Sequence, residues 1–270
     1  MKKERKCSKK KKIILGGILG VILTVVLVMV IAVAVIANQN VKAMNHCVSA
    51  VLEELEKDHT VTQLDPGAYE ELTMYGLMKF RVEQYHVEGL GNLSIMRVNM
   101  GIMQMATVVI TPTDKNLPLL SADYMYILTN RKDYLEFYDV VAEKDDAYMA
   151  LLADLEEVQS HYDYLEDIQT AEAWYAPLLT ITSYKGGATA EDPDLEHILL
   201  DSLHVYLEHA DNFPILTEEQ KAEKLAITQA YTDGLIEKGG ISTDVFKQEL
   251  GDEETKKFFD LVFFGTKAGF

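Results

Sequence analysis

The sequence of 270 residues contains very few cysteines, and its two, Cys7 and Cys47, lie on opposite sides of a long apolar segment. If that segment crosses a bilayer, the two thiols cannot meet within one chain, so no disulfide framework is available. A metal site built from cysteines is excluded as well, because such sites need several thiolates close together.

Basic residues are concentrated at the start of the chain. Residues 1–12 (MKKERKCSKKKK) carry a net charge of +7, and residues 13–270 carry −25. No basic stripe follows residue 12, and an acidic body of this kind repels a phosphate backbone. We therefore expect no nucleic-acid partner.

The common chemical motifs are also missing. The sequence has no GxGxxG before a helix, no GxxxxGK[ST], no GxSxG and no HExxH, so nucleotide-binding, hydrolase and zinc-protease functions lack support. His197 and His204 share a helix face with Asp201 between them, which leaves a metal site as an alternative. The neighbouring leucines mark the core face, and this favours surface histidines and no metal.

One long hydrophobic run is present. Ile13 to Ala37 comprises 25 residues without a charge, enough to cross a bilayer with some tilt. The apolar region of a signal peptide has only about 7–15 residues, although cleavage after Ala37 stays open as an alternative. The basic residues before the run predict a cytoplasmic N-terminus and a domain outside the cell membrane.

The chain therefore divides into four parts. Residues 1–12 form a basic tail, residues 13–37 a transmembrane helix that binds the membrane, residues 38–67 a stalk or first packing helix, and residues 68–270 one domain. The helical spacing of apolar residues from Asn38 to Asp58 supports the third part.

The first half of the domain is strand-like. Two apolar runs, Leu117–Leu128 and Tyr134–Val141, flank a polar reversal in which Asn130 is expected to take a positive φ, and this predicts a β-hairpin. Within 96–110 the even positions are the more apolar, which predicts one dry face. We expect a meandering antiparallel sheet of about five strands.

The second half is mostly helical. Thr217 and Gln220 form a capping box at the start of one helix, and further helices follow to Phe264. A sheet followed by helices is an α+β arrangement.

Two features of the sheet point to a site. Asp123 lies inside the first apolar run, where a carboxyl group is solvated or paired, or is a proton donor in a ligand pocket. Four methionines, including Met105, fall within ten residues, and they pack a core or line an adaptable pocket.

The order of several motifs resembles a known family. Ile110-Thr111-Pro112 ends a strand, a Leu-Pro-Leu-x-x-x-Asp run leads to Asp123, and Trp174 precedes another strand. A C-terminal pattern from Leu216 to Phe264 completes the series. Across roughly residues 74–265 this resembles the ferredoxin-dependent bilin reductases.

The resemblance implies an α/β/α sandwich with an antiparallel sheet and a linear tetrapyrrole (bilin) between the sheet and helices. It implies electrons from a ferredoxin- or flavodoxin-type donor, with no bound metal or flavin. Asp123 takes the place of the family's proton-donating aspartate, and Thr107, Met105 and Trp174 are the expected ligand-binding residues. A buried acid beside a pyrrole has the raised proton affinity that general-acid catalysis needs.

The sequence departs from the family at three places. Thr107 stands where some members have a catalytic histidine, a catalytic glutamate falls near Ile95, and a propionate-holding Asn-Asp-Lys stretch becomes Gly239-Gly240-Ile241. The acidic body also suits an acidic ferredoxin poorly, and the predicted topology places the domain away from ferredoxin.

Three functions remain open at this stage. The first is a membrane-anchored oxidoreductase that reduces a bilin, and the second is a non-catalytic module that binds a tetrapyrrole or another flat ligand. The third is an interaction protein that keeps the fold as a scaffold.

Overall fold

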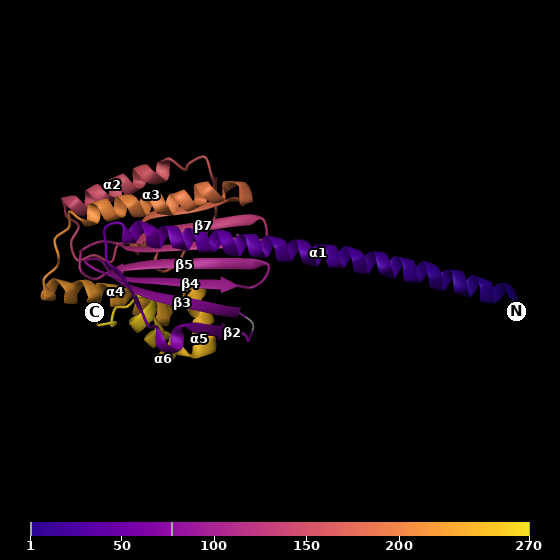
Figure 1. Cartoon of the computed structure of the whole chain (residues 1–270). Coiled ribbons are helices and arrows are strands. Elements are labelled where there is room, and N and C mark those ends of the chain that lie inside the picture. The colour runs from indigo at the N-terminus through magenta and orange to yellow at the C-terminus, as the bar shows by residue number, and fades with distance from the viewer. Residues whose placement is uncertain (1, 77, 270) are drawn as a thin grey trace.

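The computed structural model describes residues 2–76 and 78–269, apart from the side chains of residues 2–16, 241 and 242. An antiparallel sheet of nine strands lies between two layers of helices, and one long helix extends away from this body (Figure 1). The predicted α/β/α sandwich, preceded by an apolar helix, is confirmed.

The strands follow the order β1-β3-β4-β5-β6-β7-β9-β8, and β2 also pairs with β3. Their bounds are β1 Val61–Leu64, β2 Glu71–Met74, β3 Met78–Val87, β4 Gly91–Asn99, β5 Met103–Pro112, β6 Leu119–Ile127, β7 Asn130–Tyr138, β8 Glu166–Asp167 and β9 Leu179–Ala188. The predicted number of strands was too low, in part because β1, β2 and β8 have only four, four and two residues. Such short strands carry too few residues for an alternating pattern.

The central hairpin is confirmed, but its turn was placed too late. Ile127 pairs with Asn130, so Leu128 and Thr129 make the reversal and Asn130 already belongs to β7. Leu128, with a φ of 53°, takes the left-handed conformation that was expected of Asn130.

The prediction of one dry even-numbered face in 96–110 was wrong. Asn99 pairs with Gln104, so even residues of β4 share a face with odd residues of β5. Met96 and Val109 therefore pack on one side of the sheet, while Ala106 packs on the other.

The helices divide between the two faces of the sheet. Their bounds are α1 Lys2–Glu56, α2 Asp146–Ser160, α3 Asp192–Ala210, α4 Glu218–Lys238, α5 Ile241–Leu250, α6 Asp252–Phe258, the π-helix Phe259–Phe263, and the 3-10 turns Gly67–Tyr69, Ala176–Leu178 and Thr189–Glu191. Side chains from α1, α2 and α3 share one buried cluster with the sheet. Those from α4, α5, α6 and the π-helix share a second cluster on the opposite face.

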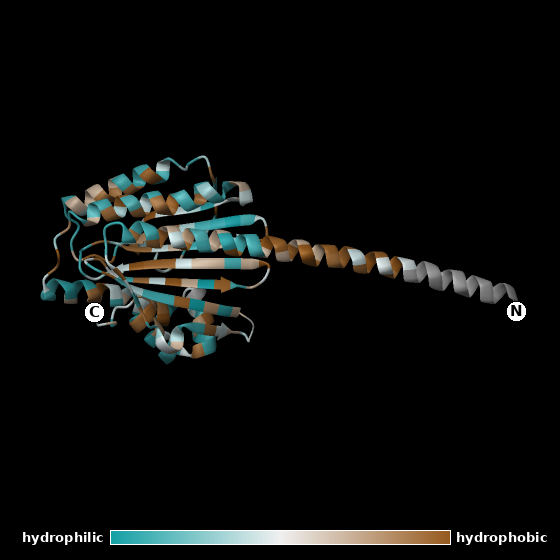
Figure 2. Cartoon of the chain, viewed as in Figure 1, coloured by the Kyte–Doolittle hydropathy of each residue, from teal (hydrophilic) through white to brown (hydrophobic). Residues whose placement is uncertain are grey.

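Helix α1 has two parts with different surroundings. Met44, Cys47 and Leu55 are buried against the sheet, so the segment from Asn38 is a packing helix. Before this part lies the most apolar stretch, with a mean hydropathy of 3.3 and none of it buried, brown in Figure 2. Among the described residues, this helix is the one long and apolar enough to cross a membrane.

The predicted start of α4 is confirmed. Thr217 accepts a hydrogen bond from the backbone N–H of Gln220, whose side chain accepts one from the Thr217 N–H. This reciprocal capping box satisfies two backbone donors that the helix leaves unpaired.

Candidate functional site

Asp123 lies in the middle of a row of polar side chains that crosses four strands. Thr107 of β5 pairs with Asp123 of β6, Asp123 with Tyr134 of β7, and Tyr134 with Tyr184 of β9. Residues paired across antiparallel strands point to the same face, and here it is the face that α4, α5 and α6 cover in part. The Thr107 hydroxyl donates a hydrogen bond to Oδ1 of Asp123.

The surroundings of Asp123 favour its protonated form. Its side chain keeps some exposure, yet protein atoms surround it closely, and this loss of hydration raises the pKa of Asp123 to about 6. The hydrogen bond from Thr107 lowers the pKa, and the negative charge of Glu136 raises it. A carboxyl group with a pKa near neutrality can hold and release a proton under physiological conditions.

Glu136 is the second acid on this face. Tyr138 donates a hydrogen bond to one oxygen of Glu136, and the Tyr184 hydroxyl donates to the other at 2.7 Å. Burial and the neighbouring Glu136 charge raise the pKa of Tyr184, so its proton stays bound at neutral pH. These tyrosines and Glu136 were missed from the sequence, although the alternation of Tyr134, Glu136 and Tyr138 was a readable signal.

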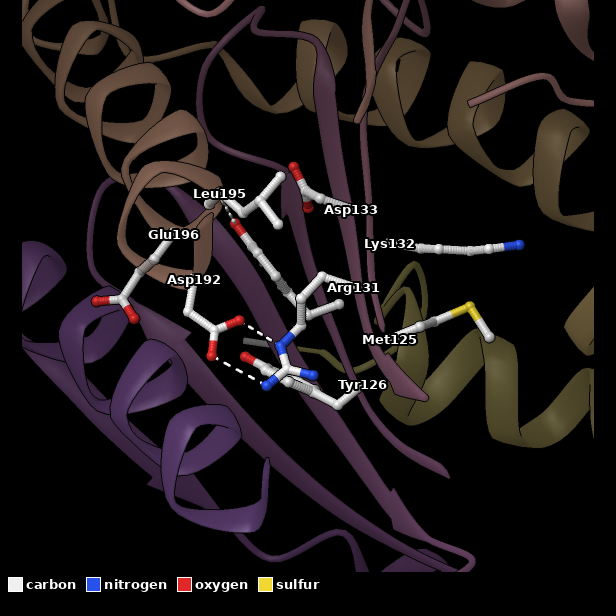
Figure 3. Close-up of a pocket in the computed structure, with 9 residues that line it drawn as sticks. Met125, Tyr126, Arg131, Lys132, Asp133, Asp192, Leu195 and Glu196 are labelled. Carbon is white, nitrogen blue, oxygen red and sulfur yellow. Dashed lines mark hydrogen bonds and ion pairs between the residues drawn. The ribbon is translucent and has the colours of Figure 1, made fainter. Parts of the chain in front are cut away.

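An incompletely covered apolar strip lies beside the polar row. Met105 pairs with Met125, and Met103 pairs with Ile127; all four side chains are half-buried. In Figure 3, Met125 and Lys132 point together toward the α4–α6 side, away from the residues of the opposite face. An apolar surface with an acid and a lysine at its margin suits a flat ligand that also carries carboxylates.

Trp174 belongs to an aromatic group at the border of this face. Its ring centroid lies 5.5 Å from that of Tyr175 and 6.2 Å from that of Tyr231, and its Nε1 donates to the Gly239 carbonyl at 2.8 Å. The charge of Asp123 contributes to the raised pKa values of Tyr175 and Tyr231, for both of which burial is the main cause. The tyrosines thus connect Trp174 with the polar row.

The sheet brings Thr107, Met105 and Asp123 together on one face, and places Trp174 at its border through Tyr175 and Tyr231. The expected position of the family's glutamate, near Ile95, does not belong to this face, because the Ile95 side chain is buried on the α1–α3 side. On the face of Asp123 the cross-strand partner of Thr107 is Met96. The side chains there include no glutamate from β4.

A small cavity lies on the other side of the sheet, between β6, β7 and α3 (Figure 3). Arg131 forms an ion pair there with Asp192, and its Nη2 donates to Oδ1 of Asn40 at 3.0 Å. The cavity has about 10 Å³ of accessible space, room for about one water molecule. A tetrapyrrole cannot occupy it, so the Asp123 face is the candidate site.

Of the two helix histidines that were considered as metal ligands, His204 has acidic partners on its own helix and on α1. Nδ1 of His204 lies 3.1 Å from Oε1 of Glu54, and its Nε2 lies 3.4 Å from Oε1 of Glu208. Within the described residues, no group of three histidine, cysteine or acidic side chains could hold a metal ion.

No protein-family model matches this sequence, and no curated protein matches it. Among solved structures, the fold is similar to that of phytochromobilin synthase from tomato, determined in complex with biliverdin, with a TM-score of 0.66. The superposition covers 83% of this chain and 84% of that chain, with 13% of the residues identical. The expected resemblance to the bilin reductases is therefore supported at the level of the fold.

Proposed function

We propose that this chain is a membrane-anchored bilin-reductase-like protein that binds a linear tetrapyrrole on the Asp123 face and reduces it. The observation that carries the proposal is Asp123 itself, a partly accessible acid with a pKa of about 6 in a sheet with the fold of a biliverdin-binding enzyme. An acid of this pKa is suited to protonate a pyrrole ring as electrons arrive.

The reaction adds two electrons and two protons to the bilin. The electrons come one at a time from an external donor of the ferredoxin or flavodoxin type, and one proton comes from the carboxyl group of Asp123. The Thr107 hydroxyl stabilises the carboxylate that remains. Solvent then returns a proton to Asp123 and supplies the second one to the product.

The apolar strip and its margins provide the binding surface. Met105 and Met125 offer polarizable thioethers to the flat face of the ligand. Trp174 limits the site at its aromatic border, and the exposed Lys132 can neutralise a propionate. These roles make Met105, Thr107 and Trp174 ligand-binding residues and Asp123 the catalytic one.

The second candidate is a tetrapyrrole-binding module without chemistry. Thr107 and Ile95 favour it, because neither side chain can supply the proton that the histidine or the glutamate of the bilin reductases would supply near these positions. The side of the membrane on which the domain lies also distinguishes the two candidate functions. The basic N-terminal tail favours a domain outside the cell, where an intracellular electron donor cannot reach it.

The test is a spectral titration of the full chain in lipid nanodiscs with biliverdin, followed by a low-potential chemical reductant. The reductase predicts a saturable shift of the visible bands and then a new bilin spectrum that empty nanodiscs do not give. A saturable shift that reductant leaves unchanged supports the binding module. Without any shift, the tetrapyrrole proposal fails in both forms.

A further inference from the structure

The turns at one end of the sheet expose large apolar side chains. Tyr75 follows β2, Ile102 connects β4 with β5, and Leu128 connects β6 with β7; they are 46%, 59% and 37% exposed. The pairs Met74–Met78, Asn99–Gln104 and Ile127–Asn130 place all three turns at the same end of the sheet. Seven such exposed side chains occur in the described chain outside α1, and three gather here.

Two of the three residues also have an unfavourable backbone conformation. Tyr75 has a φ of 51° and Leu128 a φ of 53°, and they are the non-glycine residues with positive φ in the described chain. Glycine, asparagine or aspartate is the usual choice for such a turn position, because a larger side chain crowds the backbone there. The Tyr75 hydroxyl donates to Oε1 of Gln248 at 2.8 Å, but the Tyr75 side chain remains 46% exposed. A large side chain that is both strained and exposed at such a turn indicates a further contact.

Helix α1 leaves the domain at this end. The Asn40 side chain donates to the Leu128 carbonyl at 2.9 Å, and the Leu128 N–H donates to the Ile102 carbonyl at 3.0 Å. From this contact α1 continues past the ends of the strands and away from the domain (Figure 1). The turns of Leu128 and Ile102 therefore adjoin the point at which α1 leaves the domain, and the Tyr75 turn lies at the same end of the sheet.

The distances place the turns close to a bilayer. Val35, an exposed apolar residue of α1, precedes Asn40 by five residues, which is about 7.5 Å along a helix. The headgroup region of one leaflet is about 5–8 Å thick. Because α1 is unbroken between these residues, no flexible linker can lift the turns out of that region.

We propose that Tyr75, Ile102 and Leu128 form a membrane-facing rim that inserts into the interface of the same bilayer that α1 crosses. Apolar and aromatic side chains are stabilised at this depth. The exposed Lys42 and Lys132 lie beside the rim, where their ammonium groups can contact the phosphates of lipid headgroups. The inference rests on the proposed membrane anchor and is independent of bilin chemistry.

The rim also bears on the proposed site. Met103, Ile127 and Lys132 lie at the same end of the sheet as the rim, on the strands that carry the apolar strip. An amphipathic ligand would then approach the Asp123 face from the membrane surface and not from bulk water.

The experiment uses the full chain with Cys7→Ser, which leaves the fully buried Cys47 as its native thiol. Ile102→Cys is labelled with a fluorescent probe, and the protein is reconstituted in vesicles that contain phosphatidylcholine spin-labelled at the headgroup. The matched control is Ile215→Cys, because Ile215 is also 59% exposed. The Ile215 loop lies at the opposite end of the sheet, where the Leu216 N–H donates to Asp114 O, beyond the end of β5.

We expect several-fold stronger quenching at residue 102 than at residue 215, and a similar result for Leu128→Cys. Two results would overturn the rim without affecting the proposed membrane anchor. One is equal quenching at both sites, and the other is no quenching at residue 102 in protein that floats with the vesicles. A probe shielded equally in detergent and lipid indicates a protein partner or a second copy instead. Failure to float overturns the anchor and the rim together, and the biliverdin titration reports separately on the site.

Discussion

Asp123 and Asp133 lie on neighbouring strands of the sheet and point to opposite faces. Asp123 faces the α4–α6 side and is partly accessible, whereas Asp133 is fully buried on the α1–α3 side, and neither of its side-chain oxygens has a hydrogen-bond partner. Burial raises the pKa of Asp133 well above its usual value, and the charge of Asp123 raises it further. One acid is placed where it can exchange a proton, while burial favours the protonated form of the other.

The buried acid makes the stability of the fold depend on pH. Because burial raises the pKa of Asp133 in the folded chain, the folded state binds more protons than the unfolded state above pH 4, and stability falls as pH rises. The contribution is at most about 1.4 kcal/mol per pH unit. Asp133→Asn removes this titrating group. The free energy of unfolding of Asp133→Asn minus that of the native chain should therefore increase from pH 5 to pH 8.

Thermal unfolding of the full chain in detergent, followed by circular dichroism at several pH values, measures this difference. The exposed Asp163→Asn is the control and should give a difference that does not change with pH. A constant difference for Asp133→Asn as well would show that Asp133 is already ionised in the folded protein.

Asp123→Asn tests the proposed proton donor. The amide keeps the size of the carboxyl group but cannot deliver a proton, so reduction of biliverdin should slow by about 10²-fold or more. The affinity for biliverdin, measured by the spectral shift, should change little. Asp163→Asn again serves as the control, and an unchanged rate in Asp123→Asn would exclude this residue as the donor.

Thr107→Val tests how the proton affinity of Asp123 is set. With a pKa of about 6, Asp123 loses its proton above that pH, so the reduction rate should fall with rising pH by about tenfold per unit. The Thr107 hydrogen bond favours the charged carboxylate. Its loss should move the midpoint of the pH–rate profile upward, whereas Thr107→Ser should restore the native midpoint. If valine leaves the midpoint in place, the hydroxyl does not control Asp123.

The hairpin could be predicted because a dense run of apolar and aromatic residues on either side of a polar reversal has few other solutions. Its turn could not, because Leu128 is a poor residue for a left-handed position and Asn130 two residues later is a good one. Local rules fail most often where a residue serves another purpose. The proposed contact of Leu128 with the bilayer is such a purpose.

The candidate site was predictable only in part. Asp123 was conspicuous as a carboxyl group within an apolar run, and strand pairing brings Thr107 beside it. The partnership of Glu136 with Tyr184 depends on pairing between β7 and β9, which are separated in the sequence by α2 and a long connection. No local pattern encodes a contact of that range.

Gly234→Ala tests the place of Trp174 at the border of the site. A Cβ atom at Gly234 would lie 2.4 Å from Cη2 of Trp174, so the indole must move even though alanine favours a helix. We expect a loss of about 1–3 kcal/mol in stability from overpacking, weaker biliverdin binding and a shifted emission maximum. The emission belongs to Trp174 alone, because the chain has one tryptophan.

The matched control is Ala230→Gly, an exposed change in the same helix. It should cost about 1 kcal/mol through helix propensity while emission and affinity stay native. Native emission in Gly234→Ala would mean that helix α4 moves and the indole does not. Altered emission with native affinity would remove Trp174 from the ligand-binding residues, because a displaced indole could not then be in contact with the bilin.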